Sequence, residues 1–173
     1  MLLFIEGKIK PIWGDSFKKY DYQQGSYYQP LNSMFVQEDL DEWTNKGYSI
    51  ENIVGYRHIV DDPPAWINTV LSEIGGSNHT VCFFKMNEGN VIPLHKDVYT
   101  FYKKMYNLEN SLNVWRTIVF LEGWSPGHLF AIEDTTITHW KAGQYVSWKD
   151  DTYHMAANLS SNSRYTLQIT YTK

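Results

Sequence analysis

Residues 80–97 read TVCFFKMNEGNVIPLHKD, and this stretch decides the fold. Two runs rich in β-branched, aromatic and other apolar residues, 80–86 and 91–97, flank the turn-forming sequence Asn87-Glu88-Gly89-Asn90. Such a pair of runs is typical of two antiparallel strands. Similar runs continue along the chain, and they predict eight strands, at 80–86, 91–97, 115–121, 128–133, 135–141, 144–149, 152–158 and 164–172.

The breaks between these runs contain glycine, asparagine, aspartate and serine, and we expect no helix among the strands. Eight short antiparallel strands fit a mainly β fold, the double-stranded β-helix or jelly-roll, in which two sheets enclose a pocket. We expect residues 80–173 to form this core and residues 1–79 to be its helical and irregular support. Together they would make a single domain of 173 residues.

The first 79 residues contain two helix candidates, which we expect to pack on the outside of the jelly-roll. In the clearer one, residues 62–76, Asp62 is the expected cap, Pro63 lies in the first turn and glycine ends the helix. A shorter helix is expected over residues 37–46, before Gly47. The Tyr- and Gln-rich residues 20–28 are expected to form a surface lid or an ordered arm over the sheet.

Composition argues against several classes of function. The chain has 15 basic and 19 acidic residues, a net charge of -4 and no basic stripe, so nucleic acid is not an expected partner. Residues 1–5 are apolar, but Glu6 and Lys8 follow too early for a signal peptide or a membrane span, so we expect a first strand there. The single cysteine, Cys82, cannot form an internal disulfide and is expected to be a small buried hydrophobe. The cytoplasm is the expected compartment.

Four residues carry the chemical signal. His95 and Asp97 are two positions apart on one expected strand, so their side chains should share a face. His154 lies on the seventh run and Arg164 begins the eighth, so a jelly-roll would bring all four to one mouth of the barrel. Two histidines and one carboxylate are a ligand set that holds Fe(II) at three positions and leaves the others open.

His-x-Asp, a distal His and an Arg ten residues later resemble the site of the Fe(II)- and 2-oxoglutarate-dependent oxygenases, over about residues 80–173. The resemblance implies that His95, Asp97 and His154 hold Fe(II). It also implies that Arg164 and Thr166 bind the distal carboxylate of 2-oxoglutarate. Arginine suits this role because its planar guanidinium can pair with a carboxylate through two hydrogen bonds.

Further residues suggest a branch of this family. Arg116, Gly143, residues 150–154 and Asn158 are loosely similar to the aspartyl/asparaginyl hydroxylases and to related phage and bacterial branches. Some aspartyl hydroxylases lack the carboxylate ligand that Asp97 provides, which places this chain nearer to the prolyl hydroxylases or in a branch of its own. Arg116 is expected either to bind a carboxylate of the substrate or of 2-oxoglutarate, or to be a rim residue.

The resemblance implies a dioxygenase that hydroxylates an amino-acid side chain, in a protein or in a free amino acid, and releases succinate and CO2, with ascorbate as a supporting reductant. The partner would be a peptide or a small molecule, and residues 98–113, which include Lys103 and Lys104, would form a lid. Two alternatives stay open, namely a cupin-type metalloprotein without 2-oxoglutarate and a jelly-roll binding or structural protein. Arg164 distinguishes the oxygenase from the cupin, which needs no buried guanidinium there. The sequence leaves the oligomeric state open.

The remaining histidines offer a rival to His154. His139 could take its place, with Lys149 ten residues later as the cation for 2-oxoglutarate. His154 is the better candidate because the strand that follows it begins with arginine and then alternates apolar residues. His58, His79 and His128 lack partners at a useful spacing and are expected to be structural or exposed, although His128 could line the pocket.

Overall fold

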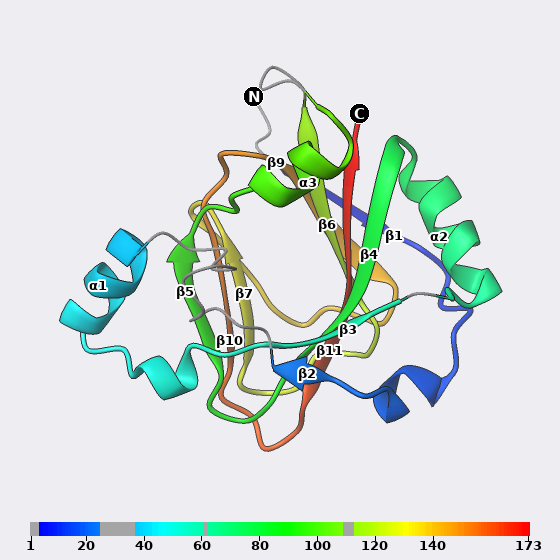
Figure 1. Cartoon of the computed structure of the whole chain (residues 1–173). Helices are drawn as coiled ribbons and strands as arrows, with labels where there is room; N and C mark the ends of the chain where they lie inside the picture. Colours follow the sequence, from blue (N-terminus) through cyan, green and yellow to red (C-terminus); the bar gives the residue numbers. More distant parts are fainter. Residues whose placement is uncertain (1–3, 25–36, 61, 109–112) are drawn as a thin grey trace.

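The computed structural model describes residues 4–24, 37–60, 62–108 and 113–173, and these ranges form two antiparallel sheets (Figure 1). The prediction of a mainly β jelly-roll is confirmed. The larger sheet has the strand order β1 (Phe4–Lys8), β9 (Gln144–Lys149), β6 (Val114–Phe120), β11 (Arg164–Thr172), β4 (Ser77–Met86), β3 (Tyr56–Ile59) and β2 (Gln23–Gln24). The smaller has the order β5 (Val91–His95), β10 (His154–Asn158), β7 (His128–Ile132) and β8 (Thr135–Ile137).

All eight predicted strands form, and two of them, β9 and β11, have the predicted bounds. β8 is shorter than the predicted run 135–141, because the chain turns at His139, which has a φ of 59°. β5 also ends before its predicted limit, at His95 instead of Asp97.

The residues before position 80 contribute strands as well as support. β1 pairs with β9, and β3 pairs with β4, so the larger sheet crosses the expected boundary between support and core. Tyr20 stacks on His58, with ring centroids 4.5 Å apart, and so lies as an arm against β3. Residues 25–28 of the expected lid or arm lie outside the described residues.

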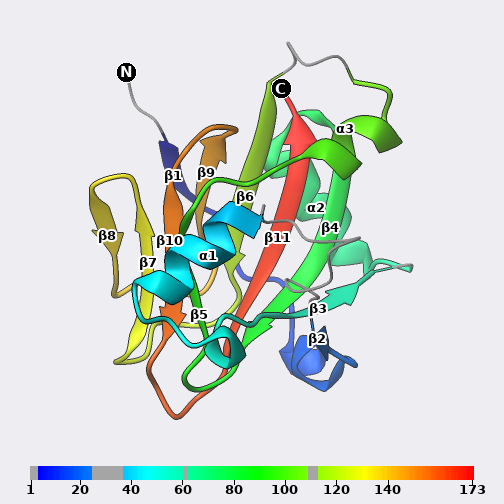
Figure 2. The same ribbon diagram turned by 60° about the vertical axis from the view of Figure 1, so that its left-hand side comes forward.

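The helix α2 (Ala65–Ile74) packs on the outer face of the larger sheet, away from the smaller sheet (Figure 2). Its buried residues Ile67, Val70 and Ile74 contact Phe83 of β4 and Leu167, Ile169 and Tyr171 of β11. Gly75 and Gly76, with φ of 75° and 84°, end the helix as predicted.

The predicted cap of α2 is wrong. Asp62 lies too early, since Pro64 is the N-cap residue and makes no side-chain cap hydrogen bond. The physical reason is that Pro64 keeps Pro63 out of the helical region, so the helix cannot begin before Ala65.

The helix α1 (Gln37–Asn45) lies beside β5 (Figure 1) and contacts both sheets. Leu40 and Trp43 pack with Phe84 and Met86 of β4 and with Ile92 of β5. The expectation of no helix among the strands is wrong, because a third helix, α3 (Thr100–Met105), lies between β5 and β6 in part of the long connection expected to be a lid. Two short 3-10 turns lie at Asp15–Lys19 and Ile50–Asn52. None of the helices in the described ranges is long and apolar enough to cross a membrane.

The two faces of β11 differ in character. Leu167, Ile169 and Tyr171 point outward into the core beneath α2. Arg164, Thr166 and Gln168 alternate with them and line a cavity between the sheets. The rest of the interior is filled by apolar side chains, Ile118, Phe120, Val146 and Trp148 from the larger sheet and Phe130 and Ile132 from the smaller.

Candidate metal centre

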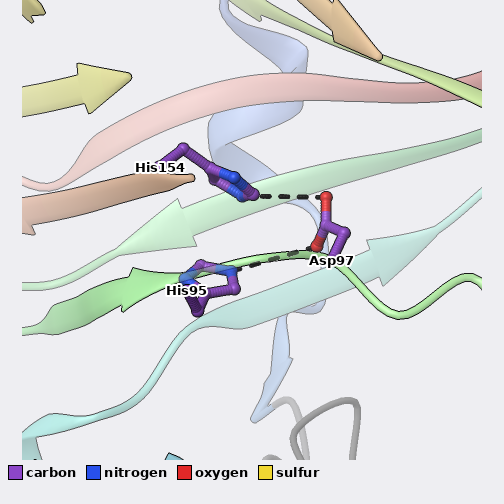
Figure 3. A group of neighbouring side chains, drawn as sticks. All are labelled: His95, Asp97 and His154. Carbon is purple, nitrogen blue, oxygen red and sulfur yellow. Dashed lines mark ion pairs between the residues drawn. The ribbon is translucent and has the colours of Figure 1, made fainter. Parts of the chain in front are cut away.

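His95, Asp97 and His154 meet at one end of the smaller sheet (Figure 3). His95 ends β5 and His154 begins β10, and the two residues are direct cross-strand partners. The Nε2 atom of His95 lies 3.9 Å from Oδ1 of Asp97, and Nε2 of His154 lies 3.7 Å from Oδ2. The three prospective ligand atoms all lie within 4.8 Å of one another.

The expectation that Asp97 shares a strand face with His95 is wrong in its details. β5 ends at His95, and Asp97 follows in the loop that leads to α3. The carboxylate still reaches both imidazole rings, because Asp97 lies just beyond the end of β5 with its side chain toward the two histidines, as Figure 3 shows.

Both histidines present the same ring nitrogen to the centre. Nδ1 of His95 lies 2.7 Å from the carbonyl oxygen of Pro93, and Nδ1 of His154 lies 3.1 Å from that of Thr152. A carbonyl oxygen can only accept, so each Nδ1 carries the hydrogen and each Nε2 keeps a lone pair for a metal. Burial lowers the pKa of His95 to about 4 and also lowers the pKa of His154, so both rings are neutral at pH 7.

A β-bulge positions His95. His154 pairs with His95 and Ala156 pairs with Ile92, so β5 has one more residue than β10 across this interval. Pro93 lies within the bulge, where a residue without an N–H group leaves no broken ladder bond. Its carbonyl oxygen is the acceptor for His95, so the bulge fixes the orientation of the ring.

Asp97 is held by two side chains that the sequence did not indicate together. Tyr99 donates a hydrogen bond to Oδ2 at 2.9 Å, and Nε of Arg116 lies 3.2 Å from the same oxygen. Burial alone would raise the pKa of Asp97, but Arg116 and the two histidines outweigh it and hold the pKa below its usual value. Asp97 is therefore a carboxylate at neutral pH, with Oδ1 on the side of His95.

Arg164 is buried, with 4% of its surface exposed, and among the described residues no carboxylate pairs with it. Its Nη1 donates to the carbonyl oxygen of Leu129 at 3.1 Å, and its guanidinium carbon lies 5.4 to 5.8 Å from the rings of Phe120, Phe130 and Trp140. Burial lowers its pKa to about 9, which leaves it charged at pH 7. A buried cation without a counter-ion is costly, so this arrangement points to an anionic ligand.

Thr166 lies on the same face of β11, two residues beyond Arg164, as predicted. Its hydroxyl makes no hydrogen bond to any other described residue. Arg164, Thr166, Arg116 and the three metal-site residues line one cavity of about 40 Å³. That volume holds about three water molecules, so a larger ligand must displace side chains as it enters.

The donor set fits Fe(II). It contains two neutral imidazole nitrogens and one carboxylate oxygen, and the Nδ1 atoms are already hydrogen-bonded in the manner that orients metal-binding histidines. The site is buried, with His95 and His154 each 6% exposed, which suits chemistry that must exclude water.

The rival histidines lie elsewhere. His139 is exposed and stacks on Trp124, with ring centroids 4.2 Å apart, and Lys149 is exposed at the end of β9. Nε2 of His79 lies 2.9 Å from the carbonyl oxygen of Gly75, and Nε2 of His128 lies 3.2 Å from that of Asn162. None of these four residues belongs to the cluster around Asp97 in the described part of the chain.

Several residues around the centre were not anticipated. Trp43 packs its ring edge against His95, with centroids 6.1 Å apart, and Trp148 lies 4.7 Å from His154. Arg57 and Gln168 line the cavity, and Gln168 could have been found from the alternation of β11 after Thr166. Cys82 is partly exposed, contrary to expectation, and its Sγ lies 3.8 Å from Oε1 of Gln168.

No protein-family model and no curated protein sequence matches the chain. Among solved structures, the fold is similar to that of a Pseudomonas putida prolyl-4-hydroxylase, with a TM-score of 0.54, 12% identity, and coverage of 92% of this chain and 96% of that one. It is also similar to an oxidoreductase of the 2OG-Fe(II) oxygenase family from Burkholderia pseudomallei, with a TM-score of 0.47, 12% identity, and coverage of 69% and 66%. For a predicted oxalate decarboxylase from Thermotoga maritima the TM-score is 0.45 and the identity 13%, with coverage of 69% of this chain and 82% of that one. At 12% identity the first likeness shows the double-stranded β-helix fold alone.

Proposed function

We propose that this chain is an Fe(II)- and 2-oxoglutarate-dependent dioxygenase that hydroxylates an amino-acid side chain. The observation that carries the proposal is Arg164, a buried guanidinium without a paired carboxylate, in the same cavity as two neutral histidines. A metalloprotein without an anionic co-substrate has no use for such a cation, whereas a dicarboxylate would satisfy it.

His95, Asp97 and His154 would hold Fe(II) through the two Nε2 atoms and Oδ1 of the carboxylate. When bound, the iron would supply the oxidation of a substrate C–H bond by O2, coupled to the oxidative decarboxylation of 2-oxoglutarate to succinate and CO2, with one oxygen atom entering the product hydroxyl and the other the succinate. Arg164 would hold the distal carboxylate of 2-oxoglutarate through its fork of N–H donors, and the Thr166 hydroxyl would donate to the same group.

Arg116 and Tyr99 would act on Asp97. Both contact Oδ2, so they keep one oxygen of the carboxylate occupied and leave the other for the metal. Arg116 also keeps Asp97 ionised inside a buried site. In this proposal Arg116 positions the metal ligand Asp97. Binding of 2-oxoglutarate then requires no contact between Arg116 and a carboxylate of the co-substrate.

The test is an anaerobic titration of the purified protein with Fe(II), with and without 2-oxoglutarate. A keto acid that chelates Fe(II) gives a weak visible absorption band, which we expect in the wild-type protein. The band should be lost in His154→Ala and kept in His139→Ala, a matched control in which an exposed histidine is removed. In Arg164→Ala the band should require a much higher concentration of 2-oxoglutarate.

The other outcomes identify the alternatives. Iron binding without a band in the presence of 2-oxoglutarate would favour a cupin-type metalloprotein. If iron does not bind, the chain is a jelly-roll binding or structural protein. Normal succinate production by His95→Ala or Asp97→Ala would contradict the proposed ligand set.

A further inference from the structure

A second cavity adjoins the metal centre. Its volume is about 310 Å³, and it lies between α3 and the inner faces of β3, β4 and β11. Arg57, Arg116 and Gln168 line both this cavity and the smaller one beside the histidines. A ligand in the larger cavity would therefore lie beside Arg116, whose Nε is 3.2 Å from Oδ2 of Asp97.

The outer wall of this cavity is apolar and unusually open to solvent. Ile59, Val98, Phe101 and Met105 line it, with exposed fractions of 71%, 47%, 75% and 50%. Single exposed apolar residues are ordinary, but four large ones around one cavity are typical of a ligand-binding surface. The wall is suited to a hydrocarbon group.

The inner wall carries positive charge and a free donor. Arg57 and Arg116 line it, and among the described residues that line either cavity the one acid is Asp97. Oε1 of Gln168 accepts from Nη1 of Arg116 at 3.4 Å and from the Cys82 thiol at 3.8 Å. Its amide N–H2 group then has no hydrogen-bond partner within the described ranges, and it can donate to an anionic oxygen.

We infer that the substrate is a small carboxylic acid with an apolar body and no free ammonium group, such as an N-acylated apolar amino acid. The apolar wall would receive the hydrocarbon, and Arg57 and Gln168 would bind the carboxylate. Among the described residues that line the two cavities, an ammonium group would find no available carboxylate, because Asp97 already contacts Arg116 and faces the metal site. The volume, at the lower end of ligand pockets, favours a small molecule over a polypeptide.

The inference rests on the proposed function, since it places the substrate beside the iron. It can be tested by calorimetric titration of the anaerobic protein loaded with Fe(II) and 2-oxoglutarate, in which no turnover occurs. The probes are N-acetyl-L-leucine, its uncharged amide and free L-leucine. We expect the acid to bind about tenfold more tightly than either of the others, the usual effect of one charge-assisted hydrogen bond.

Two variants measure separately how much the inner wall and the outer wall of the cavity contribute to ligand affinity. Arg57→Gln should reduce the affinity for the acid to that for the amide. Phe101→Ser should weaken both ligands by about three- to tenfold through lost apolar contact. Leu159→Ser is the matched control, because Leu159 is 72% exposed and lines neither cavity.

Equal affinities for acid and amide, or no binding of the acid, would overturn the inference. So would tight binding limited to a blocked peptide such as N-acetyl-Ala-Leu-Ala amide, which would identify a polypeptide substrate. The visible band recorded on the same samples separates this result from the proposed function. If the band forms but the acid does not bind, the inferred substrate is wrong and the proposed function is unaffected. If the acid binds but no band forms, the cavity is a ligand site and 2-oxoglutarate is not the co-substrate.

Discussion

Replacing Arg164 by methionine should make the metal-free protein more stable while it abolishes the response to 2-oxoglutarate. Methionine has a similar length and no charge, so it can fill the space among Phe120, Phe130 and Trp140 without the cost of a buried cation. An arginine kept for structure alone would give the opposite result.

The magnitude follows from the surroundings of the guanidinium. Burial lowers the pKa of Arg164 from 12.5 to about 9, which corresponds to roughly 5 kcal/mol of lost hydration. The three ring contacts stabilise the buried guanidinium by about 2 to 3 kcal/mol, and the hydrogen bond to Leu129 stabilises it by about 1 kcal/mol. The balance predicts that Arg164→Met raises the free energy of unfolding by about 1 to 2 kcal/mol. For a chain of this length this is roughly 3 to 6 °C in Tm.

The assay is urea unfolding of both proteins without metal, followed by thermal unfolding with Fe(II) and increasing 2-oxoglutarate under anaerobic conditions. At about a hundred times its Kd, 2-oxoglutarate should stabilise the wild-type protein by about 2.7 kcal/mol and the variant by nothing measurable. Thr166→Val is a useful companion, because it should weaken the response to 2-oxoglutarate without the gain in stability. An Arg164→Met protein that is less stable than the wild type and still responds to 2-oxoglutarate would show that Arg164 is a structural residue and does not bind the co-substrate.

Three further predictions concern the metal ligands. Asp97→Asn should lower the free energy of unfolding of the metal-free protein by about 3 to 5 kcal/mol in urea, because Arg116 loses its counter-ion in a buried place. Tyr99→Phe should reduce the affinity for Fe(II) by about tenfold in a competitive chelator titration, since Asp97 loses one of the groups that orient it. The metal-free protein should lose stability as the pH falls. The pKa of His95 is about 4 in the folded state against 6.5 ordinarily, so the unfolded chain takes up the proton first, and stability falls by about 1.4 kcal/mol per pH unit between pH 6.5 and 4. His154 adds to this loss in the same direction, and unchanged urea midpoints at pH 7 and pH 5 would contradict it.

The order of strands was predictable because turn residues separate the runs of β-forming residues after position 80. β9 has the expected bounds because turns flank both ends of its run, and β11 begins where expected because a turn precedes it. β3 was not predicted, since its four residues form a strand only by pairing with β4, which no local pattern reveals. The start of α2 was misplaced because two prolines compete with the capping signal of Asp62.

The candidate site was predictable as far as the spacing of residue types reaches. His154 and Arg164 lie where alternation along their strands places them, on the inner faces of the sheets. His95 reaches the same cavity only because the bulge shifts the alternation of β5 between Ile92 and His95. Asp97 reaches the site by a loop, and its contacts with Tyr99 and Arg116 depend on the path of that loop. Arg57 comes from a segment that carried no signal, so its position beside the metal centre required the three-dimensional structure.

The bulge at Pro93 has a further consequence, for association between molecules. β5 is an edge strand of the smaller sheet in the described part of the chain, and an edge strand can pair with the edge of another molecule and so begin aggregation. Proline and a bulge are two of the features by which natural sheets prevent such pairing. The residue that orients His95 therefore also keeps this edge of the protein from acting as a template for other chains.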